Sequence, residues 1–326
     1  MLVTALFASV ALGQRLAEVN RVFHFAHTEA AQDLQAIAAL IRSITEMRQV
    51  SADTAQRSLA VRGAAEQIEL AEWLFHELDG PDRQNSSPRE YRLSGGADNL
   101  VRVFYLAHAE KAQEVQEVAT LLRSMTDIRR LFTYMSPRAL AVRGTADQIA
   151  LAEWLIGEIY RLPQDGQAAP REYRMPRSAD DVSRVFHLAH AKTPRDLQEV
   201  ATLVRTTADV DRVLTCTGPR IVAARGTSGQ IALAAWLLSE LDRPATRNRA
   251  AQEYRFSSSM DNATVVRVSY LARADSAQRL QEIAAQVRSA TGIRRLWAYT
   301  TSGALVLRGT ADQIAAADRM IGEQDR

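Results

Sequence analysis

The segment LAVRGTADQIALAEWLIGEI, residues 140–159, decides the fold because closely similar segments occur four times in the 326-residue chain. An Arg-Gly pair marks each copy, and successive pairs are separated by 81, 82 and 83 residues. The pairs are Arg62-Gly63, Arg143-Gly144, Arg225-Gly226 and Arg308-Gly309. A run such as RVFYLAH, which starts at Arg102, lies 41 residues upstream of each pair and keeps the same steps. The sequence therefore predicts four tandem copies of one unit, with insertions confined to the segments between them.

Each copy has the pattern of a small α+β domain. In the second copy, residues 101–108 are β-branched and aromatic, which is typical of a strand. Residues 112–125 carry apolar side chains at i, i+3, i+6 and i+7, which predicts a helix with one buried face. Two further strands and a second helix follow. The order predicts an α+β fold of four tandem βαββα sandwich domains with a KH-like layout.

The expected domains span residues 15–80, 90–162, 172–243 and 253–326. Segments rich in Pro, Gly, Gln and Asn separate them, as linkers do. Each linker leads into the tripeptide Glu-Tyr-Arg, at residues 90–92, 172–174 and 253–255. The tripeptide is interpreted either as an anchor that docks the linker or as an extra edge strand of the domain that follows it.

The first 14 residues, MLVTALFASVALGQ, resemble the apolar part of a secretory signal peptide, although no basic segment precedes it. The segment is too short to span a bilayer as a helix. We therefore expect an exported, periplasmic protein, with a cytoplasmic chain as the alternative. No later stretch approaches 18 uninterrupted apolar residues, so we expect the mature chain to be soluble and to contact a membrane only through a partner.

Composition limits the classes of partner. The 40 Lys and Arg residues nearly balance the 38 Asp and Glu residues, so bulk attraction to nucleic acid or anionic lipid is not expected. Hydrophobic residues make up 47% of the chain, enough for packed cores. The single cysteine, Cys216, cannot form an intrachain disulfide and is expected to be a small buried residue.

The Arg-Gly-Thr turn is interpreted as the start of a helix. A phosphate-binding loop needs several glycines and usually a lysine, and this turn has neither. Thr145 and Gln148 have instead the spacing of a capping box, and Gly144 is expected to let the chain turn sharply out of the strand. The first copy has Ala64 at the cap position, so its cap should be weaker by about 1 kcal/mol. Capping leaves the arginine unexplained, so Arg62, Arg143, Arg225 and Arg308 are candidates for binding a carboxylate of their own domain or of a neighbour.

Tryptophan recurs in the second helix of the first three copies, at Trp73, Trp154 and Trp236, and the fourth copy has Arg319 there. On a helical wheel, Trp154 lies about 140° from Ile149, away from the apolar stripe. The replacement by a charge in the last copy suggests an inter-domain or partner contact that the terminal domain does not make. The alternative is a tryptophan that covers the flank of its own helix.

The sequence contains few candidate catalytic or metal-binding residues. His27, His108 and His190 share one column with Arg273, and His24 and His187 share another with Tyr105 and Tyr270. A catalytic or metal-binding residue does not exchange freely with tyrosine or arginine, and neither a zinc motif nor a Ser-His-Asp arrangement can be identified. We therefore expect no enzyme, no cofactor, no metal and no small-molecule substrate.

A nucleic-acid-binding array with the KH-like layout is kept as the alternative function. Arg129-Arg130 and Arg294-Arg295 form basic pairs, but the other copies have Arg48-Gln49 and Asp211-Arg212. A GXXG loop between helices, which a KH clamp needs, does not occur. Nucleic acid is therefore not the expected partner.

The unit resembles the periplasmic N-domains of secretins, the outer-membrane channels of type II and III secretion and type IV pilus systems. The resemblance rests on the first strand run, on LQEVATLVR at residues 197–205, and on V-R-G-T followed by ADQIALAEWLI. It implies non-catalytic modules that pack side by side and bind neighbouring subunits or other secretion and pilus components. No channel-forming hairpin region follows Arg326, so we expect a non-enzymatic periplasmic repeat protein that mediates protein–protein contacts or self-association, without being the channel.

Overall fold

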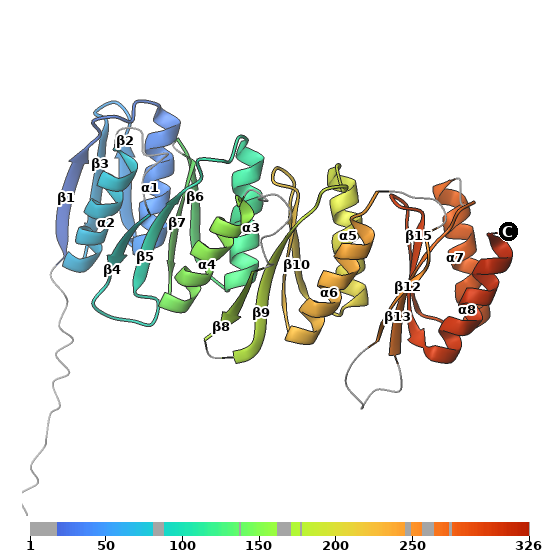
Figure 1. Ribbon diagram of the computed structural model, residues 1–326. Coiled ribbons are helices and arrows are strands. Elements are labelled where there is room, and N and C mark those ends of the chain that lie inside the picture. The colour runs from blue at the N-terminus through green and yellow to red at the C-terminus, as the bar shows by residue number, and fades with distance from the viewer. Residues whose placement is uncertain are drawn as a thin grey trace, which may run out of the picture. The chain divides into compact units, whose positions relative to one another are not determined.

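The computed structural model describes residues 18–80, 88–136, 138–161, 171–176, 178–244, 249–255, 264–273 and 276–325 (Figure 1). The segment interpreted as a signal peptide, residues 1–14, lies outside the described residues. In the described part of the chain, no helix combines the length and the apolar character needed to cross a membrane.

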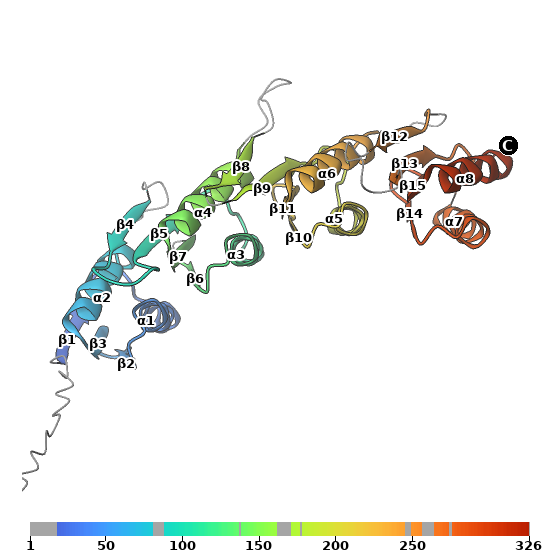
Figure 2. The ribbon, with the colours of Figure 1, turned by 90° about the horizontal axis from the view of Figure 1, so that it is seen from below.

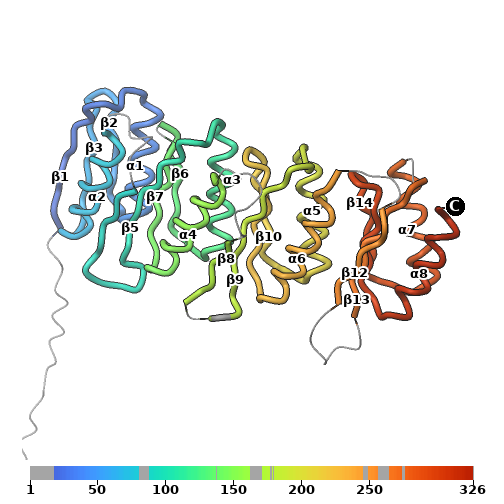
Figure 3. Tube along the Cα trace, in the orientation of Figure 1, coloured from blue at the N-terminus to red at the C-terminus, as the bar shows by residue number. Residues whose placement is uncertain are grey.

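Four antiparallel sheets and eight helices follow one another within these residues, and Figure 3 traces their order. Repeat 1 consists of β1 (Val19–His24), α1 (Ala31–Thr45), β2 (Gln49–Asp53), β3 (Ser58–Gly63) and α2 (Ala65–Leu78). Repeat 2 consists of β4 (Arg89–Arg92), β5 (Leu100–Tyr105), α3 (Ala112–Thr126), β6 (Arg130–Met135), β7 (Arg138–Gly144) and α4 (Ala146–Ile159).

The next two repeats have the same element order as repeat 2. Repeat 3 consists of β8 (Glu172–Met175), β9 (Ser178–His187), α5 (Pro194–Thr207), β10 (Arg212–Cys216), β11 (Ile221–Gly226) and α6 (Ser228–Leu241). Repeat 4 consists of β12 (Gln252–Arg255), β13 (Thr264–Tyr270), α7 (Ala277–Thr291), β14 (Arg295–Tyr299), β15 (Ala304–Thr310) and α8 (Ala311–Gln324). The predicted α+β fold with βαββα order is confirmed, whereas the exact domain boundaries stay a prediction.

The Glu-Tyr-Arg segments are edge strands of the sheets that follow them. Strands β4, β8 and β12 pair antiparallel with β5, β9 and β13. The sheets of repeats 2, 3 and 4 therefore have four strands each, in the orders β4-β5-β7-β6, β8-β9-β11-β10 and β12-β13-β15-β14. Among the described residues, the sheet of repeat 1 has three strands, in the order β1-β3-β2. The Glu-Tyr-Arg tripeptide thus forms an edge strand of the domain that follows it.

The chain divides into two compact units, and the division falls inside repeat 2. The first unit contains repeat 1 and most of the sheet of repeat 2, up to Tyr105 and again from Phe132 to Val142. The second unit contains Leu106–Leu131, with α3, and the chain from Arg143 onward, with α4 and repeats 3 and 4.

In the first unit, the helices of repeat 1 pack against two sheets. Helix α1 contacts β2, and α2 contacts β1 and β3, so both helices cover one face of their own sheet (Figures 1 and 2). The same apolar core contains Leu34 and Leu74 from these helices and Val101, Val103 and Tyr134 from the sheet of repeat 2. A helix buried on two sides needs apolar residues around most of its surface.

The second unit repeats this arrangement. Helix α5 contacts β10, and α6 contacts β9 and β11 of their own sheet. The core that contains Leu197 and Leu237 of repeat 3 also contains Val266, Tyr299 and Val306 of repeat 4. Repeat 3 thus shares one apolar core with the sheet of the repeat that follows it.

Candidate functional site: the junctions between repeats

The Arg-Gly-Thr turn is a helix cap, as predicted. Thr145 Oγ1 accepts a hydrogen bond from the Gln148 amide at 3.3 Å, and Gln148 Oε1 accepts one from the Thr145 amide at 2.9 Å. Thr227 and Thr310 make the same reciprocal pair with Gln230 and Gln313. At the first copy only the glutamine half exists, because the Ala64 methyl group cannot accept a hydrogen bond.

The glycine before each cap leaves room for the side chain of the capping glutamine. A Cβ atom on Gly144 would lie 2.9 Å from Gln148 Oε1, and one on Gly226 would lie 2.6 Å from Gln230 Oε1. Neither glycine has the left-handed φ that favours glycine. A left-handed backbone is therefore not the reason for these glycines, and the close approach of the capping side chain is a contact that the absence of a Cβ atom permits.

Arg225 binds the end of a helix in the preceding repeat. Its Nη1 donates to the main-chain carbonyl of Met125 in the last turn of α3 and lies 3.4 Å from Asp127 Oδ2. Asp127 ends α3 in a left-handed conformation, with φ of 60°. Arg212 Nη1 donates to the same carboxylate oxygen at 2.8 Å. Two cations thus bind the negative end of the α3 dipole, where positive charge is favourable.

Arg308 repeats this contact at the next junction. Its Nη1 donates to the Thr207 carbonyl in the last turn of α5 at 2.5 Å and to Asp209 Oδ2 at 2.7 Å. Arg295 Nη1 donates to the same oxygen at 2.6 Å. Although partial burial acts to raise the pKa of Asp209, hydrogen bonds and positive charge from Arg295 and Arg308 hold it below its ordinary value. The carboxylate therefore stays ionised in the junction.

Arg62, the first arginine of the column, differs from these two. Arg62 in repeat 1 forms an ion pair with Glu18 at 2.7 Å, and its side chain is 49% exposed, compared with 11% for Arg225. Arg143 is partly buried. Arg225 and Arg308 each bind a carboxylate of the neighbouring repeat. Arg225 also binds Asp181 of its own repeat at 2.6 Å.

A glutamate of each first helix binds the hairpin turn of the next repeat. Glu117 of α3 accepts hydrogen bonds from the Thr217 amide at 2.7 Å and from the Thr217 hydroxyl at 2.8 Å. Glu199 of α5 accepts from the Thr300 amide at 2.9 Å and from the Thr300 hydroxyl at 3.1 Å. The corresponding sequence positions are Ala36 in repeat 1 and Met135 in repeat 2, so the first junction has apolar residues at these positions.

The off-stripe tryptophans lie against the tyrosines of the edge strands. The ring centroids are 5.6 Å apart for Trp73 and Tyr91, 5.5 Å for Trp154 and Tyr173, and 5.5 Å for Trp236 and Tyr254. Each pair joins the second helix of one repeat to the first strand of the next. Within the described residues, no Glu-Tyr-Arg strand follows α8, and Arg319 occupies the tryptophan position there.

The exchange of histidine and tyrosine in the first strand also has a physical reason. Tyr105, His187 and Tyr270 each donate a hydrogen bond at 2.9 Å to the main-chain carbonyl of a glutamate in the preceding second helix. Either ring can supply one N–H or O–H donor, so the two residue types are equivalent here. The glutamates are themselves buried, and each pairs with an arginine at the start of the next edge strand or shortly before it: Glu77 with Arg89, Glu158 with Arg171, and Glu240 with Arg249.

His27 and His190, which occupy the same position in repeats 1 and 3 as His108 in repeat 2, have a structural role. The His27 ring donates a hydrogen bond from Nδ1 to the Asp79 carbonyl, 2.7 Å away, and the Asp79 carboxylate accepts from three successive main-chain amides at residues 26–28. Asp242 holds the corresponding loop of repeat 3 in the same way. Sequence reasoning missed these aspartates, although their fixed place after the second helix could have identified them. The described residues contain no group of three or more His, Cys, Asp or Glu placed to hold a metal.

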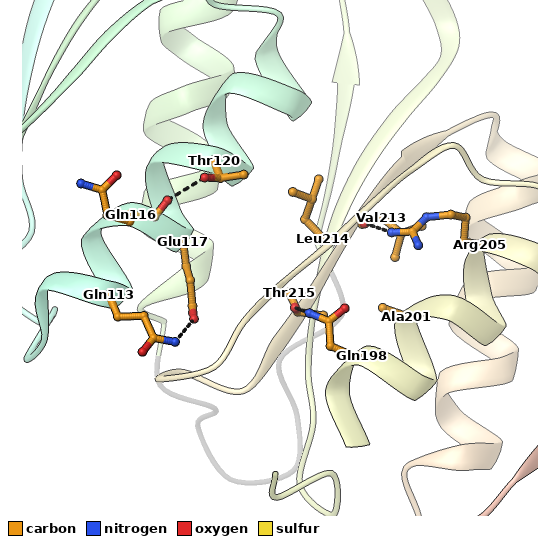
Figure 4. Close-up of a pocket in the computed structure, with 10 residues that line it drawn as sticks. All are labelled: Gln113, Gln116, Glu117, Thr120, Gln198, Ala201, Arg205, Val213, Leu214 and Thr215. Carbon is orange, nitrogen blue, oxygen red and sulfur yellow. Dashed lines mark hydrogen bonds between the residues drawn. The ribbon is translucent and has the colours of Figure 1, made fainter. Parts of the chain in front are cut away.

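A groove of about 410 Å³ opens between α3, α5 and β10 (Figure 4). Glutamine and threonine side chains line it, and Leu214 lies between the residues of α3 and those of α5 in the figure. Gln198 Nε2 donates to Thr215 Oγ1 at 2.9 Å, and Arg205 donates to the Val213 carbonyl at 2.6 Å. Several polar groups of the groove thus bind one another.

A larger cleft of about 870 Å³ lies where α3 and α4 meet repeat 3, with His108, Tyr160 and His187 in its wall. The Tyr160 hydroxyl is buried without a hydrogen-bond partner in the described part of the chain. Burial raises the pKa of Tyr160 and that of the nearby Cys216 thiol, so both groups stay protonated at neutral pH. The cleft therefore offers neither a thiolate nor a phenolate as a nucleophile.

A scan against protein-family models finds no match, and a search of curated proteins finds none either. Among solved structures, the chain is similar to the type II secretion system secretin GspD of E. coli K12, with 12% identity, a TM-score of 0.17, and coverage of 78% of this chain and 42% of that one. It is similar to Aeromonas hydrophila ExeD with 12% identity and the same TM-score, over 90% of this chain and 59% of that one. Aspartate kinase from Synechocystis reaches the same TM-score at 11% identity, over 95% of this chain and 55% of that one. The chain thus spans less than two thirds of each of these proteins, and the likeness assigns neither family nor function.

Proposed function

We propose that this chain is a non-enzymatic, exported repeat protein whose modules mediate protein–protein contacts. One observation carries the proposal: the side faces of the modules recognise other modules through side chains at fixed positions. Arg225 and Arg308 bind the helix ends of the preceding repeat, and Trp154 and Trp236 bind the edge strand of the following one. These residue types, arginine, tryptophan and tyrosine, are the ones enriched at protein interfaces.

The envelope of a bacterium with a type II or III secretion or type IV pilus system is the proposed location, and a secretin-type complex is the proposed partner. The apolar residues 1–14 and the resemblance of the repeats to secretin N-domains support this part of the proposal. Arg295, one of the basic residues that suggested nucleic-acid binding, forms an ion pair with Asp209. Nothing in the described geometry favours the nucleic-acid alternative over a protein partner.

Fractionation and cross-linking of the natural host test the proposal. The full chain, with a C-terminal tag and expressed at its natural level, is expected in the periplasmic or envelope fraction. Cross-linking in intact cells is expected to join it to secretin-type subunits or their assembly partners. Residence in the cytoplasm, or retention of the purified chain on single-stranded RNA at physiological salt, would contradict the proposal.

A further inference from the structure

In repeats 2, 3 and 4, an edge strand pairs with one side of the strand that corresponds to β1. In the described part of repeat 1, this side of β1 is not paired with another strand. Strands β5, β9 and β13 each pair with an edge strand on one side, whereas β1 pairs only with β3 in the described part of the chain. The exposure of its side chains reflects this: Val22 is 55% exposed, whereas its counterparts Val103 and Val268 are fully buried and Val185 is partly buried. An open edge that carries apolar side chains is a template for another strand.

The hydrogen-bonding groups of this edge can be identified from the register. The Phe25 amide donates to the Arg57 carbonyl, so the opposed pair of these two residues is a hydrogen-bonded one. Such pairs alternate along an antiparallel ladder, which directs the amides and carbonyls of Asn20, Val22 and His24 away from β3. In repeat 2, the counterparts Val101 and Val103 are opposite Tyr91 and Arg89 of the covering strand β4.

The covering strands also show which side chain the edge recognises. Glu90, Glu172 and Glu253 lie opposite Arg102, Arg184 and Arg267 of the first strands, with N–O distances of 3.9, 3.6 and 3.1 Å. The corresponding residue of β1 is Arg21, which pairs with Glu72 of α2 and is 54% exposed. The three arginines under a covering strand are 16–25% exposed. Arg21 thus lacks the carboxylate that a covering strand supplies to each of its counterparts.

We propose that β1 binds an extended segment of a partner protein, which pairs antiparallel with it and places a glutamate or aspartate opposite Arg21. Main-chain hydrogen bonds from Asn20 and Val22 supply the affinity, and Arg21 supplies the preference for an acidic residue. The inference rests on the proposed function only in taking the partner to be a protein.

The chain's own sequence upstream of β1 does not provide this acidic residue. Counting 81 residues back from Glu90 leads to Ser9, within the segment A-S-V-A at residues 8–11. That segment has neither the glutamate nor the tyrosine of the three covering strands. Charge complementarity therefore favours a strand from another molecule.

A peptide titration of the full-length protein tests the proposal. The probe is a fluorescent peptide with the sequence of residues 168–176, AAPREYRMP, which contains the covering strand of repeat 3. The matched control peptide has glutamine in place of the glutamate. Saturable binding, measured by anisotropy at low salt, is expected to be stronger for the glutamate peptide by about 1.5- to 5-fold, as for a partly exposed ion pair.

Two protein variants locate the binding. Val22→Pro removes the outward amide without removing a hydrogen bond to β3, and it is expected to weaken binding by about tenfold or more. Val22→Ala keeps the amide and serves as its control, with circular dichroism and the exchange of β3 amides as checks of folding. Arg21→Gln is expected to make the protein bind both peptides equally.

Each other outcome overturns the proposal. Absence of saturable binding would show that the edge is occupied or unsuited, as when residues 8–11 cover it. If Val22→Pro bound the peptide as tightly as the natural chain does, the peptide would not bind at β1. If Arg21→Gln still preferred the glutamate peptide over the glutamine peptide, Arg21 would not be the residue that recognises an acidic side chain. A concentration-dependent dimer that Val22→Pro abolishes, without peptide binding, would assign the edge to a second copy. All these measurements use purified protein, so their failure leaves the cellular test of the proposed function unaffected.

Discussion

Arg225 and Arg308 each bind a carboxylate and a helix-terminal carbonyl, two acceptors that single out the end of a helix. The acidic residue follows the helix in a left-handed conformation, with φ of 60° at Asp127 and 54° at Asp209. Aspartate tolerates this conformation better than most residues. One residue thus ends the helix and presents the charge to the next repeat. In repeat 4 the corresponding residue is Gly292, with φ of 68°, which ends α7 without supplying a carboxylate.

The charge of Asp209 makes the stability of the last junction depend on pH. Because its pKa is lower in the folded than in the unfolded chain, Asp209 stabilises the fold above its unfolded pKa of about 4, and this contribution is lost as the pH falls through the folded pKa. Asp209→Asn is therefore expected to be less stable than the natural chain at pH 7, with a difference that shrinks toward pH 3. Urea unfolding at both pH values measures this. Asp211→Asn, at an exposed neighbour, is the control, and a constant difference across pH would contradict the prediction.

The missing N-cap of α2 can be repaired. Ala64 has φ of −66° and ψ of 155°, close to the −75° and 162° of the capping residue Thr145, and Gln67 already makes the other half of the box. Ala64→Thr is expected to stabilise α2 by about 1 kcal/mol. Hydrogen exchange of the α2 amides measures the gain. Thr145→Ala should lose a similar amount in α4, and equal exchange in Ala64→Thr and the natural chain would show that the threonine cap contributes nothing.

At the scale of elements, the second helix of each repeat has two apolar faces where another repeat follows it. Helix α6 has leucine or tryptophan at positions where α8 has Ala316, Arg319 and Gln324. Leu233 and Leu241, the counterparts of Ala316 and Gln324, are fully buried. The first helix has one apolar face and a polar one, which carries Glu117 or Glu199 to the next turn. The two helices therefore contribute different kinds of contact to one junction.

The tryptophan–tyrosine pairs predict a measurable coupling. Trp154→Ala and Tyr173→Ala each remove one ring of a tilted pair at 5.5 Å. A double-mutant cycle of unfolding free energies is expected to give an interaction of about 0.5–1.5 kcal/mol. The matched cycle combines Trp154→Ala with Tyr254→Ala, a tyrosine of a different pair, and should be additive. Additivity of both cycles would show that Trp154 only covers its own helix.

At the scale of the whole molecule, the sheet of repeat 1 and helix α8 of repeat 4 each carry polar residues at positions where other repeats carry apolar ones. The outer face of the repeat 1 sheet has Ser51 and Asp53, whereas repeat 4 has Trp297 and Tyr299 at these positions, packed against repeat 3. Helix α8 has Arg319 at the tryptophan position. Polar end units are the usual way in which repeat proteins stay soluble. These two faces thus lack the apolar residues through which repeat 3 packs against repeat 4.

Removal of repeat 4 tests this interpretation. A chain that ends at residue 249 would expose the face of α6 that packs with Val266 and Val306, so we expect it to associate, as seen by light scattering after gel filtration. The same truncated chain with Leu233→Ala and Trp236→Arg copies the residues of α8 and is expected to associate less. Circular dichroism verifies that both fold. A monomeric truncated chain without these substitutions would show that repeat 4 does not serve as a cap.

The sequence by itself determined the period, the βαββα order and the helix caps, because these depend on residues a few positions apart that four copies repeat. The partners of the arginines and tryptophans required the tertiary structure: Arg212 and Asp127 are 85 residues apart, and no local pattern pairs them. The edge strands illustrate what the sequence can and cannot predict. Their Glu-Tyr-Arg tripeptides are visible in the sequence, but only the structure shows that each pairs with the strand that follows it. Only the structure shows, too, that β1 has no such partner strand in the described residues. Local signals fix elements, whereas burial and hydrogen-bond pairing between distant segments decide which faces and edges remain for a partner.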